Sequence, residues 1–123
     1  MKIMVIDDEE DIQILFKQQF RKELKSGTVE FQFATSGESA LDFLEKGGSL
    51  NINQILSDIN MPGMTGIELL KKIKEQYHQL KVSMITAYAD EHNFQEARKH
   101  GCDEYFTKPL DFVNLKQKIL GVA

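Results

Sequence analysis

Short apolar runs alternate with longer amphipathic segments along the chain. Residues 2–6, 54–57 and 82–86 are built around Ile, Val, Leu and Met, which is typical of buried strands in a parallel sheet. Residues 29–33 instead alternate apolar and polar side chains, which predicts a strand with one wetter face at an edge of the sheet. Residues 105–107 are predicted to form a fifth, brief strand. The pattern therefore predicts five strands.

Between these runs, apolar residues recur at the spacing of an amphipathic helix. Thr35 with Glu38, and Thr65 with Glu68, have the spacing of a capping box and predict where the second and third helices begin. The predicted helical stripes are Ile12, Leu15, Phe16 and Phe20; Ala40, Leu41 and Leu44; Ile67, Leu70, Ile73 and Tyr77; Phe94 and Ala97; and Phe112, Leu115 and Ile119.

The first helix is predicted to be one continuous element that Gly27 ends. Its first turn is acidic and its last turns are basic at Arg21, Lys22 and Lys25, which suits the helix dipole. Counted this way, five helices alternate with the five strands. The sequence therefore predicts an α/β fold, a flavodoxin-like three-layer sandwich whose five-stranded parallel sheet has the order 2-1-3-4-5.

Composition is that of one soluble globular domain. The chain has 123 residues, no Ser/Pro/Gly-rich linker, 41% hydrophobic and 28% charged residues. The net charge is -4, and the excess of acidic side chains lies in residues 1–60, which carry 11 acidic and 6 basic side chains and disfavour nucleic acid as a partner. No apolar run approaches the ~18 residues of a membrane span, so we expect a cytoplasmic protein. The single cysteine, Cys102, excludes an internal disulfide.

Carboxylates follow two strands that the predicted order makes neighbours. Asp7 and Asp8 end the first strand and Asp58 ends the third, where the chain reverses direction and an open α/β sheet has its ligand crevice. Each pair of carboxylates ~4 Å apart would repel by a few kcal/mol at an effective dielectric near 20. A hard divalent cation with oxygen ligands relieves this repulsion, so the sequence predicts a Mg²⁺ site.

The remaining strand ends supply a hydroxyl and a cation. Thr86 ends the fourth strand and Lys108 follows the fifth, and both can reach anionic oxygens beside a metal. Seen singly, Thr86 is a strand-favouring residue, Lys108 a solvated lysine, and Asp58 a carboxylate that binds its own turn. Together they indicate a phosphoryl-transfer site with a covalent aspartyl phosphate.

These residues stand in motifs that resemble the receiver domains of two-component response regulators, and the resemblance runs from Lys2 to about Leu120. The motifs are Val-Ile-Asp-Asp-Glu at 5–9, Asp-Ile-Asn-Met-Pro-Gly-Met-Thr-Gly at 58–66, Ile-Thr-Ala at 85–87 and Tyr-Phe-Thr-Lys-Pro at 105–109. They occur in the order and at the spacing of that family. The expected domain is a single receiver over residues 1–123, without an output domain.

The resemblance implies that Asp58 accepts a phosphoryl group from a phosphohistidine of a sensor histidine kinase or a histidine phosphotransfer protein. It also implies a Mg²⁺ site in which Asp8, Asp58 and the backbone carbonyl of Asn60 are direct ligands and Asp7 acts through a water. Asn60 and Tyr88 occupy positions that look like tuners of the phosphoryl lifetime. Such a chain is a phosphoacceptor that assists its own phosphorylation and dephosphorylation, not an enzyme.

The resemblance further implies that Lys108 pairs with the phosphoryl group, that Thr86 hydrogen-bonds it, and that Tyr105 changes rotamer with Thr86. The Lys108-Pro109 bond is expected to be cis. Residues 90–100 offer little apolar surface and should form a loosely held helix. With the strand around Tyr105 and the last helix, they form the expected binding face for a downstream protein target.

Other protein classes fit less well. A phosphatase of the haloacid-dehalogenase type has its nucleophile in an Asp-x-Asp pattern after the first strand, where this chain reads Asp7-Asp8-Glu9. A flavin-binding flavodoxin needs a Ser/Thr/Gly-rich phosphate loop there, and carboxylates would repel its cofactor. The alternative that stays open is an interaction module of the same fold that is never phosphorylated.

Overall fold

Five parallel strands form the single sheet of the computed structural model, which describes residues 1–88 and 90–121. The sheet has the order β2-β1-β3-β4-β5 and every neighbouring pair is parallel, as predicted. β2 is an edge strand, also as predicted. The strands are β1 (Lys2–Ile6), β2 (Glu30–Ala34), β3 (Gln54–Asp58), β4 (Lys81–Thr86) and β5 (Tyr105–Thr107).

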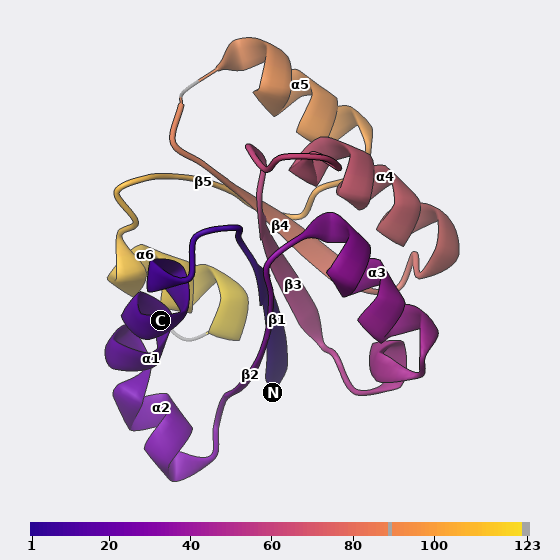
Figure 1. Ribbon diagram of the computed structural model, residues 1–123. Helices are drawn as coiled ribbons and strands as arrows, with labels where there is room; N and C mark the ends of the chain where they lie inside the picture. Colours follow the sequence, from indigo (N-terminus) through magenta and orange to yellow (C-terminus); the bar gives the residue numbers. More distant parts are fainter. Residues whose placement is uncertain (89, 122–123) are drawn as a thin grey trace.

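Helices cover both faces of the sheet and make the three-layer sandwich (Figure 1). Within the described residues the helices are α1 (Asp11–Gln19), α2 (Arg21–Ser26), α3 (Gly37–Glu45), α4 (Gly66–Gln76), α5 (Glu91–Lys99) and α6 (Phe112–Leu120), with one 3₁₀ turn, η1 (Gly48–Leu50). α1, α2 and α6 pack on one face, and α3, α4 and α5 pack on the other. None of these helices has the length and apolar character needed to cross a membrane.

The two faces of the sheet bury two separate apolar clusters. Ile3 and Val5 of β1 point to the face that Phe16 covers, whereas Met4 and Ile6 point to the opposite face. Because successive side chains of a strand point to opposite faces, a fully apolar run such as β1 supplies both clusters at once. Burial on both sides fixes the register of the central strands and thereby the positions of their carboxyl ends.

The prediction of five helices was wrong, because the first one is broken at Phe20. This residue leaves the helical conformation, with φ -103° and ψ 19°, and separates α1 from α2. Its ring is fully buried, stacks on Phe16 at 5.8 Å between centroids and meets Phe31 of the edge strand edge-on at 5.1 Å. We attribute the break to this aromatic packing, which outweighs continuation of the helix.

One predicted helix start was also displaced. Ser36, not Thr35, caps α3, and its hydroxyl accepts the backbone N–H of Ser39 at 3.0 Å. Ser36 has the extended backbone that an N-cap needs, and serine is a somewhat better N-cap residue than threonine, which favours Ser36 over the Thr35 of the predicted capping box. The capping box of Thr65 and Glu68 at the start of α4 is confirmed.

α5 is held by little apolar surface, as predicted. Ala97 is its only buried residue, and Asp90 caps its first turn by accepting the backbone N–H of His92 at 2.9 Å. Phe94 adds an edge-on contact with the ring of Tyr105 on β5, at 5.1 Å between centroids. The aromatic pair therefore joins α5 to the edge strand on that side of the sheet.

Candidate phosphoacceptor and metal site

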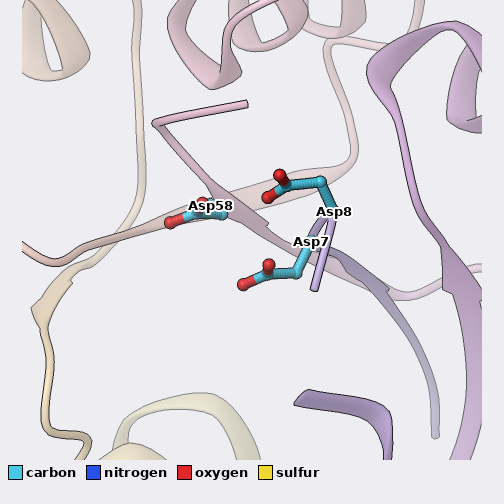
Figure 2. A group of neighbouring side chains, drawn as sticks. All are labelled: Asp7, Asp8 and Asp58. Carbon is cyan, nitrogen blue, oxygen red and sulfur yellow. The ribbon is translucent and has the colours of Figure 1, made fainter. Parts of the chain in front are cut away.

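Three carboxylates meet at the carboxyl ends of β1 and β3, as Figure 2 shows. These strands are neighbours, with Ile6 opposite Ser57, so Asp7, Asp8 and Asp58 follow at the same edge of the sheet. Each of the three offers an oxygen, and these oxygens all lie within 4.8 Å of one another. Asp7 and Asp58 are each only 6% exposed, whereas Asp8 faces solvent. The predicted convergence is therefore present.

Lys108 supplies a positive charge beside this cluster. Its backbone N–H donates to the carbonyl of Thr86 at 2.8 Å, which fixes where the chain leaves β5. Its Nζ donates to Asp7 Oδ2 at 3.3 Å and lies 3.6 Å from Asp58 Oδ1. The Lys108-Pro109 bond is cis, as predicted.

Burial and neighbouring charges shift the pKa values of Asp58 and Lys108. Burial, followed by the neighbouring Asp7 carboxylate, raises the pKa of Asp58 from an ordinary 3.8 to about 6, although Lys108 opposes this. Burial lowers the pKa of Lys108, but Asp58 and Asp7 together outweigh it, and the pKa ends above its ordinary value. At neutral pH the side chains are therefore an ionised carboxylate and an ammonium group.

The cluster suits a hard divalent cation. Its three carboxylates carry more negative charge than Lys108 alone can balance, and two of them are withdrawn from water. Carboxylate oxygens are the ligands that Mg²⁺ takes from proteins at phosphoryl-transfer sites. The donor set therefore fits Mg²⁺, whose binding would offset the mutual repulsion of the carboxylates.

Thr86 lies beside the carboxylates but is bonded elsewhere. Its side chain is fully buried, and its hydroxyl donates to Asn60 Oδ1 at 3.4 Å while accepting the backbone N–H of Tyr88 at 3.2 Å. Asn60 is two residues beyond Asp58, and its side chain is exposed. Within the described chain, no hydrogen bond joins Thr86 to Asp58.

Tyr105, the residue predicted to move with Thr86, is half-buried on β5. Its hydroxyl oxygen is buried and makes no hydrogen bond of good geometry with another described residue, although the Thr86 side chain lies near enough to act on its pKa. Burial, followed by the nearby Asp90 carboxylate, raises the pKa of Tyr105 although the Thr86 side chain opposes this, so the phenol is neutral. A buried hydroxyl without a hydrogen-bond partner costs free energy, which favours a second rotamer in which the hydroxyl is bonded or solvated.

Sequence reasoning missed two residues that shape the site. Gly66 opens α4, and a Cβ there would overlap the backbone carbonyl of Asp58, so only glycine allows α4 to start this close to β3. Its backbone N–H donates to the carbonyl of Ile59 at 2.9 Å. The other is the contact of the Asn60 side chain with Thr86, since Asn60 was predicted only to bind the metal through its backbone carbonyl and to tune the phosphoryl lifetime. The one available signal was the position of both residues inside the 58–66 motif.

The fold and the site together define a phosphoacceptor domain of the receiver type. The family model described as "Response regulator receiver domain" matches residues 3–120, so the chain belongs to that family. It accordingly takes part in two-component phosphorelay signalling, and the alternative of a purely structural module is not favoured.

Several known proteins are similar over nearly the whole chain. Sporulation initiation phosphotransferase F of Bacillus subtilis is 35% identical over 118 residues, which cover 96% of this chain and 90% of that protein. Chemotaxis protein CheY-3 of Vibrio cholerae is 37% identical over 121 residues, or 97% and 88% of the two chains. The crystal structure of response regulator TrrA from Thermotoga maritima, in complex with Mg²⁺-BeF, has a TM-score of 0.80 and 32% identity, covering 98% of this chain and 96% of that one.

Proposed function

We propose that Asp58 is the residue of this receiver domain that accepts the phosphoryl group. The observation that carries the proposal is the position of its carboxylate, buried at the end of β3 between Asp7, Asp8 and the ammonium of Lys108. Asp7 and Asp8 are less suited to the role. Asp7 already accepts hydrogen bonds from Lys108 and from the backbone N–H of Glu9, and Asp8 is exposed.

In the proposed step, a carboxylate oxygen of Asp58 forms a bond to phosphorus while the bond between phosphorus and the donor's histidine nitrogen breaks. The bonding electron pair stays on that nitrogen. Lys108, 3.6 Å from Asp58 Oδ1 before transfer, is placed to pair with the phosphoryl oxygens after it. A pKa of about 6 leaves Asp58 ionised, and hence nucleophilic, at neutral pH.

The metal ligands in this proposal are Asp8, Asp58 and the backbone carbonyl of Asn60, with Asp7 acting through a water. The hydrogen bonds that Asp7 already accepts support its indirect role, since they occupy oxygen lone pairs that a metal would need. Bound Mg²⁺ would neutralise charge on the transferring phosphoryl group. The chain changes its own covalent state in this scheme, so we class it as a phosphoacceptor and not as an enzyme with a separate substrate.

The donor in this proposal is a sensor histidine kinase or a histidine phosphotransfer protein. An apolar hollow of about 330 Å³ next to Lys108 supports a docking place for it. The hollow lies between α1 and the segment after β5, and Ile12, Leu15, Leu110 and Phe112 help to line it. A donor that covers these side chains would bring its phosphohistidine to the carboxyl edge of the sheet.

The output in this proposal is a change on the face formed by α5, β5 and α6, where a downstream protein binds. Two observations support it. α5 is held by one buried alanine and the contact of Phe94 with Tyr105, and Tyr105 has a hydroxyl without a partner in the described chain. An element held so weakly can have two arrangements that differ by only a few kcal/mol.

Incubation with acetyl phosphate and Mg²⁺ followed by intact mass measurement tests the phosphoacceptor. Wild type should gain one phosphoryl group, and Asp58→Asn should gain none, because an amide is not a nucleophile. Asp11→Asn is the matched control, since Asp11 is an exposed carboxylate that is close in sequence to Asp7 and Asp8 but lies outside the cluster. Undiminished labelling of Asp58→Asn would assign the phosphoryl group to another residue.

A further inference from the structure

The hydroxyl proton of Thr86 is already in use in this structure. A threonine hydroxyl has one proton to donate, and here it goes to Asn60 Oδ1 at 3.4 Å. The backbone N–H of Tyr88 donates to the same oxygen at 3.2 Å, so the hydroxyl is held from two sides. Thr86 is fully buried, so in this arrangement its hydroxyl has no contact with solvent.

The side chain of Asn60 is available to hold the Thr86 hydroxyl. The metal role proposed for Asn60 uses only its backbone carbonyl, and its amide makes no other hydrogen bond with a described residue. Its position two residues beyond Asp58, in the loop that leaves β3, keeps the amide oxygen beside the end of β4. The backbone N–H of the intervening Ile59 donates to the carbonyl of Ile85 at 3.0 Å and fixes this approach.

We propose that the Asn60 side chain is a positioning residue that holds the Thr86 hydroxyl away from the phosphoryl position in the unphosphorylated protein. The inference rests on the proposed function, in which a phosphoryl group on Asp58 accepts the hydrogen bond of Thr86. Both acceptors then compete for one proton, so phosphorylation must break the contact between Thr86 and Asn60. Asn60 thereby sets how readily the switch leaves its resting state.

The strength of the contact suits this role. A separation of 3.4 Å is long for an O–H···O hydrogen bond, whose common range ends near 3.0 Å, so the bond is weak. A charged phosphoryl oxygen is a stronger acceptor than a neutral amide oxygen and wins the competition once it is present. Loss of one neutral hydrogen bond changes an equilibrium by roughly 2- to 10-fold, which is the effect to expect here.

The test is a double-mutant cycle on the affinity for beryllofluoride with Mg²⁺, where beryllofluoride stands in for the phosphoryl group. The four proteins are wild type, Asn60→Ala, Thr86→Val and the double variant, and NMR titration gives each affinity. Asn60→Ala alone should bind beryllofluoride roughly 2- to 10-fold more tightly than wild type. In the Thr86→Val background the same change should have no effect, because no hydroxyl remains to be held.

A second measurement compares the NMR signals of the proteins in the free state. Without beryllofluoride, the NMR signals of Thr86 and Tyr105 in Asn60→Ala should move part of the way toward their positions in the bound wild type. Asn93→Ala is the matched control, because Asn93 lines the same hollow beside Asn60 but makes no contact with the Thr86 hydroxyl. It should leave both the affinity and the signals as in wild type. Asn60 is exposed, so its replacement should leave the fold intact.

Two results would overturn the inference while leaving the proposed function in place. One is wild-type or weaker affinity in Asn60→Ala, and the other is an equal gain from Asn60→Ala with and without the Thr86 hydroxyl. Failure of wild type to bind beryllofluoride with Mg²⁺ would instead remove the proposed function itself, and this inference with it.

Discussion

The ammonium of Lys108 lies 3.6 Å from Asp58 Oδ1, although the strands that position them are not neighbours in the sheet. Asp58 ends β3 and Lys108 follows β5, with β4 between them. The long lysine stem bridges this gap because all strands end at the same edge. The proposed phosphoacceptor and its counter-charge are thus held by separate elements.

Mg²⁺ should raise the melting temperature, because it binds the folded carboxylate cluster and not the unfolded chain. At a concentration 100 times its dissociation constant, the gain in the free energy of unfolding is about 2.7 kcal/mol. Asp8→Ala should reduce this gain by removing a direct ligand. Without Mg²⁺ the same change should raise the melting temperature, because it relieves repulsion by Asp7 and Asp58.

Thermal unfolding of Asp8→Ala and wild type with and without millimolar Mg²⁺ measures both effects. Glu10→Ala is the control, since Glu10 is an exposed acid near the cluster but outside it. Its response to Mg²⁺ should equal that of wild type. A wild-type melting temperature indifferent to millimolar Mg²⁺ would contradict the metal site.

The raised pKa of Asp58 predicts a pH dependence of stability in metal-free solution. A folded pKa of about 6 against an ordinary 3.8 means that the folded protein binds the proton more tightly. Its contribution to stability is therefore present below pH 4 and is lost as pH rises through 6. The free energy of unfolding should fall across this window by on the order of 1–3 kcal/mol through Asp58 alone.

Asp58→Asn removes this titration. With EDTA present, the variant should be more stable than wild type at pH 7, and the difference should shrink as pH falls toward 4. Urea unfolding at a series of pH values measures it. Asp11→Asn, which changes an exposed carboxylate, should show no comparable gain. Equal stability of Asp58→Asn and wild type at pH 7 would mean that burial does not penalise the Asp58 charge.

Gly66→Ala should destabilise the protein, because the new Cβ would overlap the carbonyl of Asp58, a backbone atom that cannot move aside without shifting β3. Overpacking of this kind costs about 1–3 kcal/mol. It should also weaken the Mg²⁺ effect, since the shifted backbone carries Asp58. Urea unfolding with and without Mg²⁺ measures both losses.

Gly37→Ala is the matched control for this prediction. Gly37 occupies the first position of α3, as Gly66 does in α4, but the three atoms nearest to a Cβ there all belong to the side chain of Met64 and not to the backbone. Its cost should be smaller, and its response to Mg²⁺ should be that of wild type. Equal losses in the two variants would mean that the helix start, not the approach to Asp58, requires glycine.

The strands and the carboxylate cluster could be predicted from the sequence because both depend on local patterns and one topological rule. Once the order 2-1-3-4-5 is assumed, the carboxyl ends of β1 and β3 must be adjacent, which brings Asp7, Asp8 and Asp58 together whatever their rotamers. The prediction that Lys108 reaches the cluster required only that a long side chain follow β5 at the same edge of the sheet. The site was therefore predictable to the level of which residues meet.

Features that depend on side-chain packing could not be predicted in this way. We attribute the break at Phe20 to its packing against Phe16 and Phe31, and Leu69 is fully buried although it lay outside the predicted stripe of its helix. The contact between Asn60 and Thr86 joins residues 26 positions apart and depends on their rotamers. A periodic pattern contains no information about such contacts, so they appear only in the structure.

Thr86→Ala should separate phosphorylation from its consequence. The change removes the hydroxyl that we propose couples the phosphoryl group to Tyr105, but it leaves Asp58, the other carboxylates and Lys108 in place. Labelling of Asp58 should therefore be largely intact. The response at Tyr105 and at the packed ring of Phe94 should be blunted, because the switch has lost the group through which the phosphoryl acts.

Amide chemical shifts or hydrogen exchange, compared with and without beryllofluoride and Mg²⁺, measure that response from Tyr88 to Leu115. Thr86→Ser, which keeps a hydroxyl, should respond as wild type does. The coupling model fails if wild type shows no change in this region, or if Thr86→Ala changes there as fully as wild type.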